Sequence, residues 1–301
     1  MKKVLLIYGG ESYEHDISIK SYNTIINNID KTKYIVDSVY ITKDNIWLNN
    51  NKEIENIISF IKKFDVVFPI IHGYGGEDGK LQGLFDLFDI KYVGSKCGSS
   101  YICMDKLRTK EILNNYDIPT VPYKLDSDIE EYPVIVKPSN GGSSIGITVA
   151  KTKEELDESI DVAHKYDKKV IIEKFLDNPL EIECACIKNN GDLIIEIGTI
   201  EQNNTFYDYK TKYENDTVVT NLNPDITDEI KKQLKYYCNK IFSILDLDGY
   251  ARIDFLYKDK LYLNEINTIP GFTDISMFPM LISKTGINYK DIITMLIENC
   301  N

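Results

Sequence analysis

Near the carboxyl end of the chain lie two short runs of alternating side chains: Tyr250-Ala251-Arg252-Ile253-Asp254-Phe255-Leu256-Tyr257 and Leu261-Tyr262-Leu263-Asn264-Glu265-Ile266-Asn267. Only three residues, Lys258-Asp259-Lys260, separate the runs, so the pattern predicts an antiparallel hairpin. Because side chains alternate between the faces of a strand, Arg252 and Asp254 share one face of the first strand. Glu265 and Asn267 likewise share one face of the second strand.

Pairing of these strands is expected to gather two carboxylates and one amide oxygen, from Asp254, Glu265 and Asn267. Like charges repel, so such a cluster is unfavourable without a cation. Ligands that are all oxygen atoms suit Mg²⁺, and Arg252 adds a fixed cation that can stabilise developing negative charge. The alternative, a solvated hairpin with ordinary surface charge, remains open on spacing alone.

The composition indicates a soluble globular protein and argues against two classes of partner. The chain has 301 residues, of which 43% are hydrophobic and 27% charged, so two or three domains are expected. The formal net charge of -12 argues against a nucleic-acid binder, although a local cationic site for phosphate is still compatible with it. No apolar run approaches the roughly 20 residues that span a bilayer, so no membrane partner is expected.

The cysteines and the first residues indicate a cytoplasmic protein. Six cysteines form no Cys-x-x-Cys pair and have no neighbouring His cluster, so free thiols are expected rather than a zinc site. The apolar run after Lys3 ends within a few residues at Gly9-Gly10. It is therefore interpreted as a first strand and not as a signal peptide.

The order of expected elements divides the chain into three units. In residues 1–95, strands at 4–8, 34–41 and 65–71 and a helix at 16–28 predict a Rossmann-like parallel α/β domain. In residues 96–179, a helix at 104–115, strands at 132–138, 147–150 and 170–175, and a helix at 153–166 predict a small α+β domain. In residues 180–301, we expect strands at 181–187 and 193–200, a polar loop from Gln202 to Thr220, a helix at 225–245, the hairpin and a last helix at 290–299.

A phosphate-binding loop is predicted in the second unit. The Walker A motif is absent, because Ile147 follows Gly146 where the motif requires Lys, and the dinucleotide fingerprint is absent after the first strand. Lys137 instead precedes a loop rich in Gly and Ser, residues 140–146, whose backbone N–H groups can close over phosphates. Lys106 and Lys137 are candidates for neutralising phosphate, and the alternative for either is an ordinary surface lysine.

Short motifs occur in a fixed order along nearly the whole chain. They are Tyr8-Gly9-Gly10, Glu14-x-x-x-Ser18, His72-Gly73-x-Gly75-Gly76-Glu77-Asp78-Gly79, Leu81-Gln82-Gly83, Met104-Asp105-Lys106, Val136-Lys137-Pro138, Gly142-Ser143-Ser144-x-Gly146, Glu173-Lys174-x-Leu176, Phe206-Tyr207-Asp208-Tyr209-x-x-Lys212-Tyr213, Arg252-Ile253-Asp254 and Asn264-Glu265-x-Asn267-Thr268-x-Pro270-Gly271. In this order they resemble the D-alanine-D-alanine ligases of the ATP-grasp superfamily. The resemblance implies the ATP-grasp fold, with a Rossmann-like N-terminal domain and two α+β domains that enclose ATP.

The resemblance also implies roles for matching residues. Those assigned to ATP are Lys106 and Lys137 at the phosphates, Glu173, Lys174 and Leu176 at the adenine, Glu181 at the ribose, and Ser144 and Lys212 elsewhere in the site. Two Mg²⁺ ions, or Mn²⁺, would be held by Asp254, Glu265 and Asn267. The first D-alanine would meet Glu14, which Ser143 and Tyr213 would join in a hydrogen-bonded set that holds a lid shut. Arg252 and the Gly271 N–H would form the oxyanion site, and the second D-alanine would meet His72, Ser276 and Met277.

The implied chemistry explains why such parts are needed. Transfer of the γ-phosphoryl group of ATP to a D-alanine carboxylate would make an acyl phosphate, which the amine of a second D-alanine attacks. The first step needs positioned cations, and the intermediate must be kept from water, which suits a lid formed by the polar loop from Gln202. The product, D-alanyl-D-alanine, is a precursor of peptidoglycan.

Several alternatives stay open at this point. A ligase that takes D-serine or D-lactate as its second substrate would share the motifs, although Tyr213 favours D-alanine. A regulatory nucleotide-binding relative would be expected to have lost part of the set Asp254, Glu265 and Asn267. A nicotinamide-dependent oxidoreductase is disfavoured by the missing fingerprint. His72, which ends an apolar strand, is equally well explained as a structural histidine. A homodimer is the family expectation.

Overall fold

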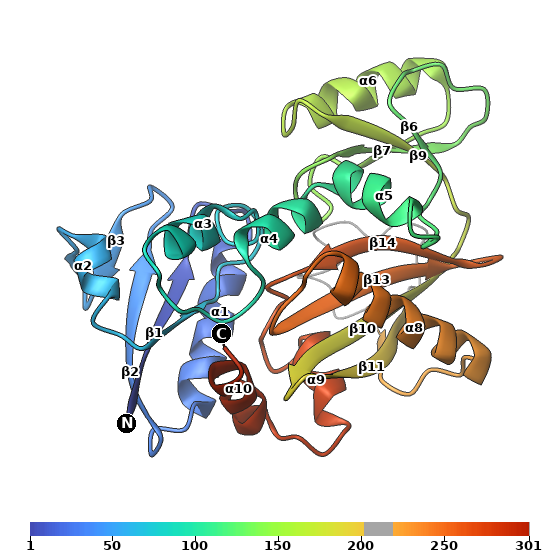
Figure 1. Ribbon diagram of the computed structural model, residues 1–301. Helices are drawn as coiled ribbons and strands as arrows, with labels where there is room; N and C mark the ends of the chain where they lie inside the picture. Colours follow the sequence, from blue (N-terminus) through green and yellow to red (C-terminus); the bar gives the residue numbers. More distant parts are fainter. Residues whose placement is uncertain (202–218, 301) are drawn as a thin grey trace.

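The computed structural model describes residues 1–201 and 219–300, which form three β-sheets with helices packed around them (Figure 1). The N-terminal sheet has the order β4-β3-β2-β1-β5. Its strands are β1 (Lys2–Gly9), β2 (Tyr34–Ile41), β3 (Trp47–Asn49), β4 (Lys52–Glu53) and β5 (Val66–Pro69). Its helices are α1 (His15–Asn28), α2 (Ile57–Ile61) and α3 (Lys80–Leu87). The mixed α/β architecture confirms the expected fold class.

Strand β1 is buried on both faces, as its continuous apolar run predicts. It pairs in parallel with β2 and β5. Leu5 and Ile7 belong to the core of the N-terminal unit. Val4 and Leu6 belong to a different core, which they share with side chains from the end of the chain such as Ile292. The carboxyl-terminal helix therefore packs beside α1 (Figure 1).

The central sheet has the order β6-β9-β7-β8. Its strands are β6 (Tyr123–Lys124), β7 (Val134–Pro138), β8 (Thr148–Ala150) and β9 (Val170–Lys174). The same part of the chain contains helices α4 (Cys97–Met104), α5 (Lys106–Asn114) and α6 (Lys153–His164), of which α6 packs on the sheet. The expected helix at 104–115 is thus wrong at its start, because two helices meet at Asp105.

The break between α4 and α5 has a local cause. Asp105 adopts an extended conformation, with φ -87° and ψ 97°, and its carboxylate accepts a hydrogen bond from Arg108 N at 3.2 Å. This is N-capping, which favours a helix start at the following residue. The same carboxylate accepts a hydrogen bond from Ser139 Oγ at 2.5 Å. Asp105 therefore ties the start of α5 to the loop that follows β7.

The C-terminal sheet is antiparallel, in the order β12-β11-β10-β13-β14. Its strands are β10 (Leu180–Asn189), β11 (Asp192–Glu201), β12 (Val219–Asn221), β13 (Tyr250–Tyr257) and β14 (Leu261–Asn267). Its helices are α8 (Asp228–Ile244), α9 (Met277–Ser283) and α10 (Tyr289–Glu298). The predicted hairpin is confirmed. The last two residues of the expected polar loop belong to β12, and residues 202–218 lie outside the described part.

The hairpin is interrupted by a β-bulge. Asp254 lies opposite Glu265, but Phe255 lies opposite Leu263, so Asn264 is an extra residue on β14. A bulge places two successive residues of one strand against one residue of its partner and redirects a side chain. Asn264 and Glu265 consequently both line one cavity.

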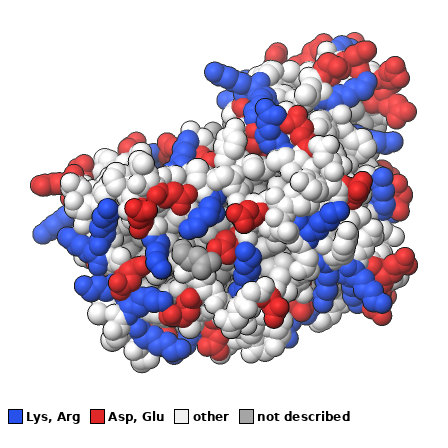
Figure 2. Space-filling view, viewed as in Figure 1, with Lys and Arg blue, Asp and Glu red and all other residues white. Residues whose placement is uncertain are grey.

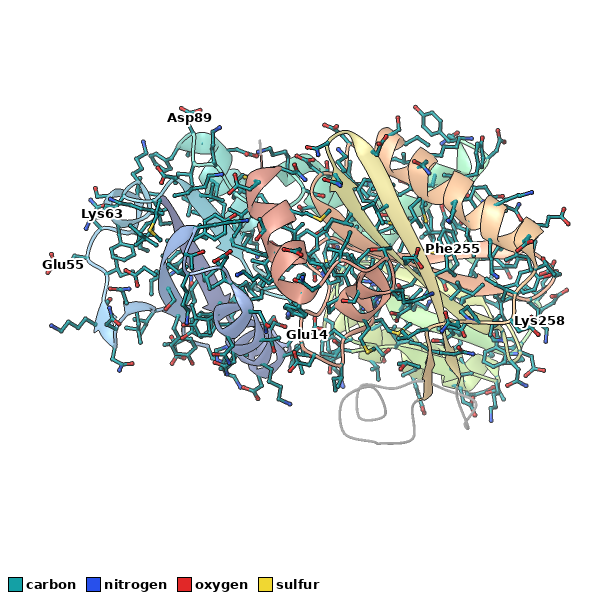
Figure 3. The ribbon with its side chains drawn as sticks, turned by 90° about the horizontal axis from the view of Figure 1, so that it is seen from below. Glu14, Glu55, Lys63, Asp89, Phe255 and Lys258 are labelled. Carbon is teal, nitrogen blue, oxygen red and sulfur yellow. The ribbon has the colours of Figure 1, made fainter. Side chains whose placement is uncertain are left out.

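Figure 2 shows basic and acidic side chains interspersed over the visible face, with the grey residues not described. Within the described ranges, every helix is too short or too polar to cross a lipid bilayer. Figure 3 places Glu14 toward the middle of the molecule and Lys258 at the far end of the hairpin.

The hairpin core offers a test of the fold. Ile253 has no exposed surface and packs in the core of the C-terminal sheet. Ile253→Ala should lower the free energy of unfolding by about 2–5 kcal/mol, because it leaves a cavity. Ile275, which is 83% exposed, supplies the control. Ile275→Ala should change the free energy of unfolding by about 0.5 kcal/mol or less. Equal effects in urea denaturation would show that the hairpin core is wrongly assigned.

Candidate active site

Two adjoining cavities lie where the three sheets meet. The larger has a volume of about 640 Å³ and is lined from β7, β9, β10, β13 and β14. The smaller, about 40 Å³, is closed by residues of the N-terminal unit, among them Glu14 and His72. Lys106, Glu265, Gly141 and Gly142 line both cavities. A molecule in one cavity would therefore touch a molecule in the other.

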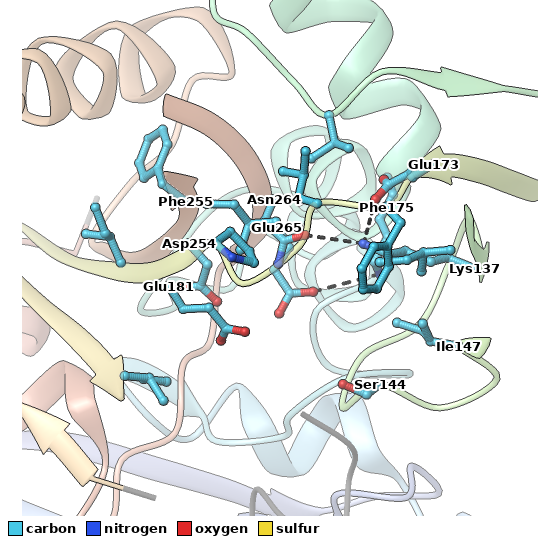
Figure 4. Close-up of a pocket in the computed structure, with 18 of the residues that line it drawn as sticks. Lys137, Ser144, Ile147, Glu173, Phe175, Glu181, Asp254, Phe255, Asn264 and Glu265 are labelled. Carbon is cyan, nitrogen blue, oxygen red and sulfur yellow. Dashed lines mark hydrogen bonds and ion pairs between the residues drawn. The ribbon is translucent and has the colours of Figure 1, made fainter. Parts of the chain in front are cut away.

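A buried group of charges lies at one side of the larger cavity, which Glu173 and Lys137 line. Glu173 Oε2 lies 2.7 Å from Lys137 Nζ, and Glu173 Oε1 lies 2.9 Å from Lys110 Nζ. Lys137 also donates to Asn264 Oδ1 at 3.4 Å (Figure 4). Burial alone would raise the pKa of Glu173, but the ammonium groups of Lys137 and Lys110 hold that pKa at about 2. Glu173 is therefore ionised and keeps Lys137 at the cavity wall.

Lys106 approaches the same space from the first turn of α5. Its Nζ donates to the carbonyl of Gly141 at 2.5 Å and lies 4.0 Å from Glu265 Oε2. Burial lowers the pKa of Lys106, and the charge of Glu265 opposes that effect. Lys106 and Lys137 thus line one cavity, and their contact with phosphates stays a prediction.

The loop after β7 bends sharply between the two cavities. Ser143 and Ser144 have φ values of 54° and 57°, a left-handed conformation that is uncommon for residues other than glycine. Ser144 lines the larger cavity and Ser143 the smaller one. The Ser143 hydroxyl is buried and has no hydrogen-bond partner among the residues that the structure describes. A buried polar group without a partner is costly, which suits a group that meets a ligand.

The hairpin brings its predicted residues together. Asp254 pairs with Glu265 and Arg252 with Asn267 across the two strands. Arg252 donates to both carboxylate oxygens of Asp254, at 2.8 and 2.7 Å, and Asn267 Nδ2 donates to Asp254 at 3.1 Å. Figure 4 shows Asp254, Glu265 and Glu181 around one space. The alternative of a solvated hairpin is excluded, because Arg252 and Asp254 are each only 8% exposed.

The donor set fits a divalent cation that prefers oxygen. In the described part of the chain, no three His, Cys, Asp or Glu side chains already form a metal-binding group. Asp254, Glu265 and Asn267 instead offer two carboxylates and an amide, with Arg252 compensating Asp254. Mg²⁺ commonly takes one or two carboxylates and completes its shell with phosphate and water. The three residues therefore match that ion without a preformed cage.

His72 is fully hydrogen-bonded at the rim of the smaller cavity. Its Nδ1 lies 2.8 Å from the carbonyl of Ile269, so this nitrogen donates. Its Nε2 lies 2.9 Å from Ser21 Oγ and accepts. Burial lowers the pKa of His72, which favours the neutral ring. The interpretation as a structural histidine is therefore supported, because both ring nitrogens have partners.

Glu77 joins the N-terminal unit to the segment after the hairpin. Its carboxylate accepts from Gly73 N at 2.8 Å and from Ile269 N at 2.7 Å. Burial, and then the charge of Glu14, raise the pKa of Glu77 to about 8. Glu77 therefore orients the loop beside His72, and Gly271 lines the smaller cavity a little further along that segment.

The remaining predicted residues are placed as follows. Lys174, Leu176 and Glu181 line the larger cavity. Met277 is buried in the core that the N-terminal sheet shares with α9 and α10, so the structure does not bring it to the smaller cavity. Ser276 also does not line that cavity, and its Oγ accepts from Thr273 N at 3.0 Å. Lys212 and Tyr213 lie outside the described residues.

Three residues at the site were missed by sequence reasoning. Lys110 stands one helical turn after Lys106, a spacing that places both on one side of a helix. Glu183 pairs with Asp254 across β10 and β13, and its carboxylate lies 3.2 Å from Arg252 Nε. Because residues two apart on a strand share a face, Glu183 could have been predicted from the position of Glu181. Asn264 reaches the cavity through the bulge, for which the sequence carries no signal.

Two family models cover most of the chain. The "D-ala D-ala ligase N-terminus" matches residues 3–59 and 52–95, and the "D-ala D-ala ligase C-terminus" matches residues 111–298. The D-alanine–D-alanine ligase of Acetivibrio thermocellus is 39% identical over 99% of this chain and 95% of its own. The ligase of the same name from Clostridium novyi is 39% identical over 99% and 97%.

Solved structures agree with these matches. The VanG D-Ala:D-Ser ligase from Enterococcus faecalis has a TM-score of 0.87 and 29% identity, covering 99% of this chain and 98% of its own. The D-alanine–D-alanine ligase from Bacillus anthracis complexed with ATP has a TM-score of 0.82 and 28% identity, covering 99% and 97%. The chain belongs to the D-alanine–D-alanine ligase family and has the ATP-grasp fold of that family.

Proposed function

We propose that this protein joins two D-alanine molecules into D-alanyl-D-alanine, through a D-alanyl phosphate, for peptidoglycan precursor synthesis. ATP is the phosphoryl donor and becomes ADP. The observation that carries the proposal is the junction of the two cavities, where ammonium groups and carboxylates stand beside a small pocket that contains Glu14. Curated relatives with the name D-alanine–D-alanine ligase support it.

The larger cavity is proposed to hold ATP. Its phosphates would meet Lys106, Lys137 and the loop that carries Ser144, because these supply cationic and hydroxyl groups at one end. The adenosine would lie toward Lys174, Leu176 and Glu181 at the other end. Glu173 would act mainly by holding Lys137, since both its oxygens are engaged by lysines. Lys212 remains a proposed contact from outside the described residues.

Two Mg²⁺ ions, or Mn²⁺, are proposed at Asp254, Glu265 and Asn267. When bound, the metal neutralises negative charge on the phosphates and so eases phosphoryl transfer. The chain's own contribution is to hold two carboxylates in register on one face of the hairpin. Arg252 then offers a buried guanidinium that stays charged. Burial lowers the pKa of Arg252, but the charges of Asp254 and Glu183 have the larger effect and raise it.

The smaller cavity is proposed to take the amino-acid substrates. Glu14 would accept the ammonium of the first D-alanine, and the Ser143 hydroxyl would complete that contact. Arg252 and the Gly271 N–H would stabilise the oxyanion that forms when the amine attacks the acyl phosphate. Glu77 and His72 would fix the surrounding backbone, because their buried polar atoms bind backbone or serine partners. Tyr213 is proposed to join Glu14 and Ser143 when the site closes.

A second candidate is the use of D-serine in the second site. The VanG D-Ala:D-Ser ligase is a close structural relative, and Met277 does not line the smaller cavity. D-Alanine remains the favoured second substrate, because the curated relatives carry that name. We further propose units at 1–95, 96–179 and 180–301, a homodimer as the family expectation, and a cytoplasmic location.

The test is a phosphate-release assay combined with mass spectrometry of the product. Purified protein with ATP and Mg²⁺ should release phosphate only when D-alanine is present, and the product should have the mass of the dipeptide. D-Serine and D-lactate are offered in separate reactions, each together with D-alanine. Efficient mixed products would favour the second candidate, and turnover with an unrelated carboxylate alone would refute both.

The metal assignment gives a separate prediction. Asp254→Asn and Glu265→Gln should each abolish measurable turnover, because each removes one negative charge from the metal site. Asp259→Asn is the matched control, since this carboxylate lies in the exposed turn of the same hairpin. It should leave turnover close to that of the unchanged protein. Full activity in either of the first two variants, with thermal unfolding unchanged, would remove the hairpin from the metal site.

A further inference from the structure

Lys110 is a buried lysine that the proposed chemistry does not use. Its side chain is 2% exposed, and its Nζ contacts Glu173 Oε1 at 2.9 Å and the carbonyl of Val121 at 3.3 Å. It also lies 5.7 Å from the centre of the Tyr123 ring. It does not line either cavity. Burial of an ammonium group is costly even when it is paired, so a purpose beyond packing is expected.

The pairing of Lys110 with Glu173 affects the net charge around Lys137. Each carboxylate oxygen of Glu173 meets a different lysine, Oε1 meeting Lys110 and Oε2 meeting Lys137. Two ammonium groups and one carboxylate leave the group with one net positive charge. Without Lys110, Glu173 and Lys137 would form a neutral pair, and both oxygens could turn to Lys137.

The group also fixes position across the site. Lys110 comes from α5, Glu173 from β9 and Lys137 from β7. Lys137 reaches Asn264 on β14, at 3.4 Å, and so connects the central sheet with the hairpin. Because Glu173 is held from behind by Lys110, its Oε2 has one orientation. The Lys137 ammonium is thereby held on the cavity wall.

We propose that Lys110 is a positioning residue for nucleotide binding, which acts through Glu173 to hold Lys137 in place and to keep its positive charge available to the phosphates. This inference rests on the proposed use of ATP in the larger cavity. It assigns no contact between Lys110 and the nucleotide. The low pKa of Glu173 agrees with it, because both lysines contribute to that shift.

Direct titration of ATP binding, without D-alanine, tests this role. Lys110→Met should weaken ATP binding at least about tenfold, and kcat at saturating ATP should change less than KM for ATP. Lys110→Arg, which keeps the charge, should retain most of the affinity. Arg108→Met is the matched control, because Arg108 lies on the same helix, is 52% exposed and pairs with Glu111. It should bind ATP as the unchanged protein does.

A double variant separates the electrostatic role from simple packing. Lys110→Met with Glu173→Gln restores one net positive charge, carried by Lys137. It should bind ATP more tightly than Lys110→Met alone. Binding that is weaker in the double variant than in the single one would overturn the proposal, as would unchanged affinity in Lys110→Met. Thermal unfolding of every variant shows whether it is folded at the temperature of the titration. If Lys110→Met is unfolded, Lys110→Arg carries the test, because a loss of ATP affinity of about tenfold or more in Lys110→Arg would also overturn the proposal.

The outcomes also distinguish this inference from the proposed function. ATP binding by the unchanged protein without dipeptide formation would refute the ligase proposal alone. Dipeptide formation with equal ATP affinity in the unchanged protein and Lys110→Met would refute the role of Lys110 alone. Absence of ATP binding by the unchanged protein would refute both.

Discussion

The register of three adjacent strands is the constraint on which the site depends. Glu183 on β10 lies opposite Asp254 on β13, which lies opposite Glu265 on β14. Like charges directly across a sheet are destabilising, so this row persists only with cations beside it. Arg252 bonds to Asp254 and lies 3.2 Å from Glu183, while Lys106 approaches Glu265. A shift of one residue would turn the row to the opposite face and bury the charges in the core.

Much of this arrangement follows from local pattern, and the rest follows from tertiary contacts. Alternation along the hairpin correctly predicts that Arg252 and Asp254 share a face, because that depends only on strand geometry. The bulge at Asn264 is not visible in the sequence, because it depends on how β14 pairs with β13. The break at Asp105 was missed although an N-cap residue marks it: the expected helix began at Met104, which is instead the last residue of α4.

The packing of the chain's two ends explains why Met277 does not line the smaller cavity. Ser276 and Met277 follow shortly after Gly271, and the resemblance implies that both contact the second D-alanine. Met277 instead begins α9, whose apolar side chains join Val4 and Leu6 in one core. Burial of a helix face against the N-terminal sheet outweighs nearness in sequence. The same packing holds Glu77 against Ile269 N, so the wall of the smaller cavity is built from both ends of the chain.

The protein is acidic overall, yet lysines gather at its larger cavity. The difference between exposed and buried charges explains how both can hold. A net charge of -12 is spread over a solvated surface, where water and salt weaken each interaction. Lys106, Lys110 and Lys137 are each less than 10% exposed, where interactions between charges are stronger. Burial also makes each ammonium group costly, so each lysine has a carboxylate partner. A site that must attract phosphate therefore cannot contain lysines alone, and Glu173 and Glu265 lie among them because a buried ammonium group without a carboxylate partner is strongly destabilising.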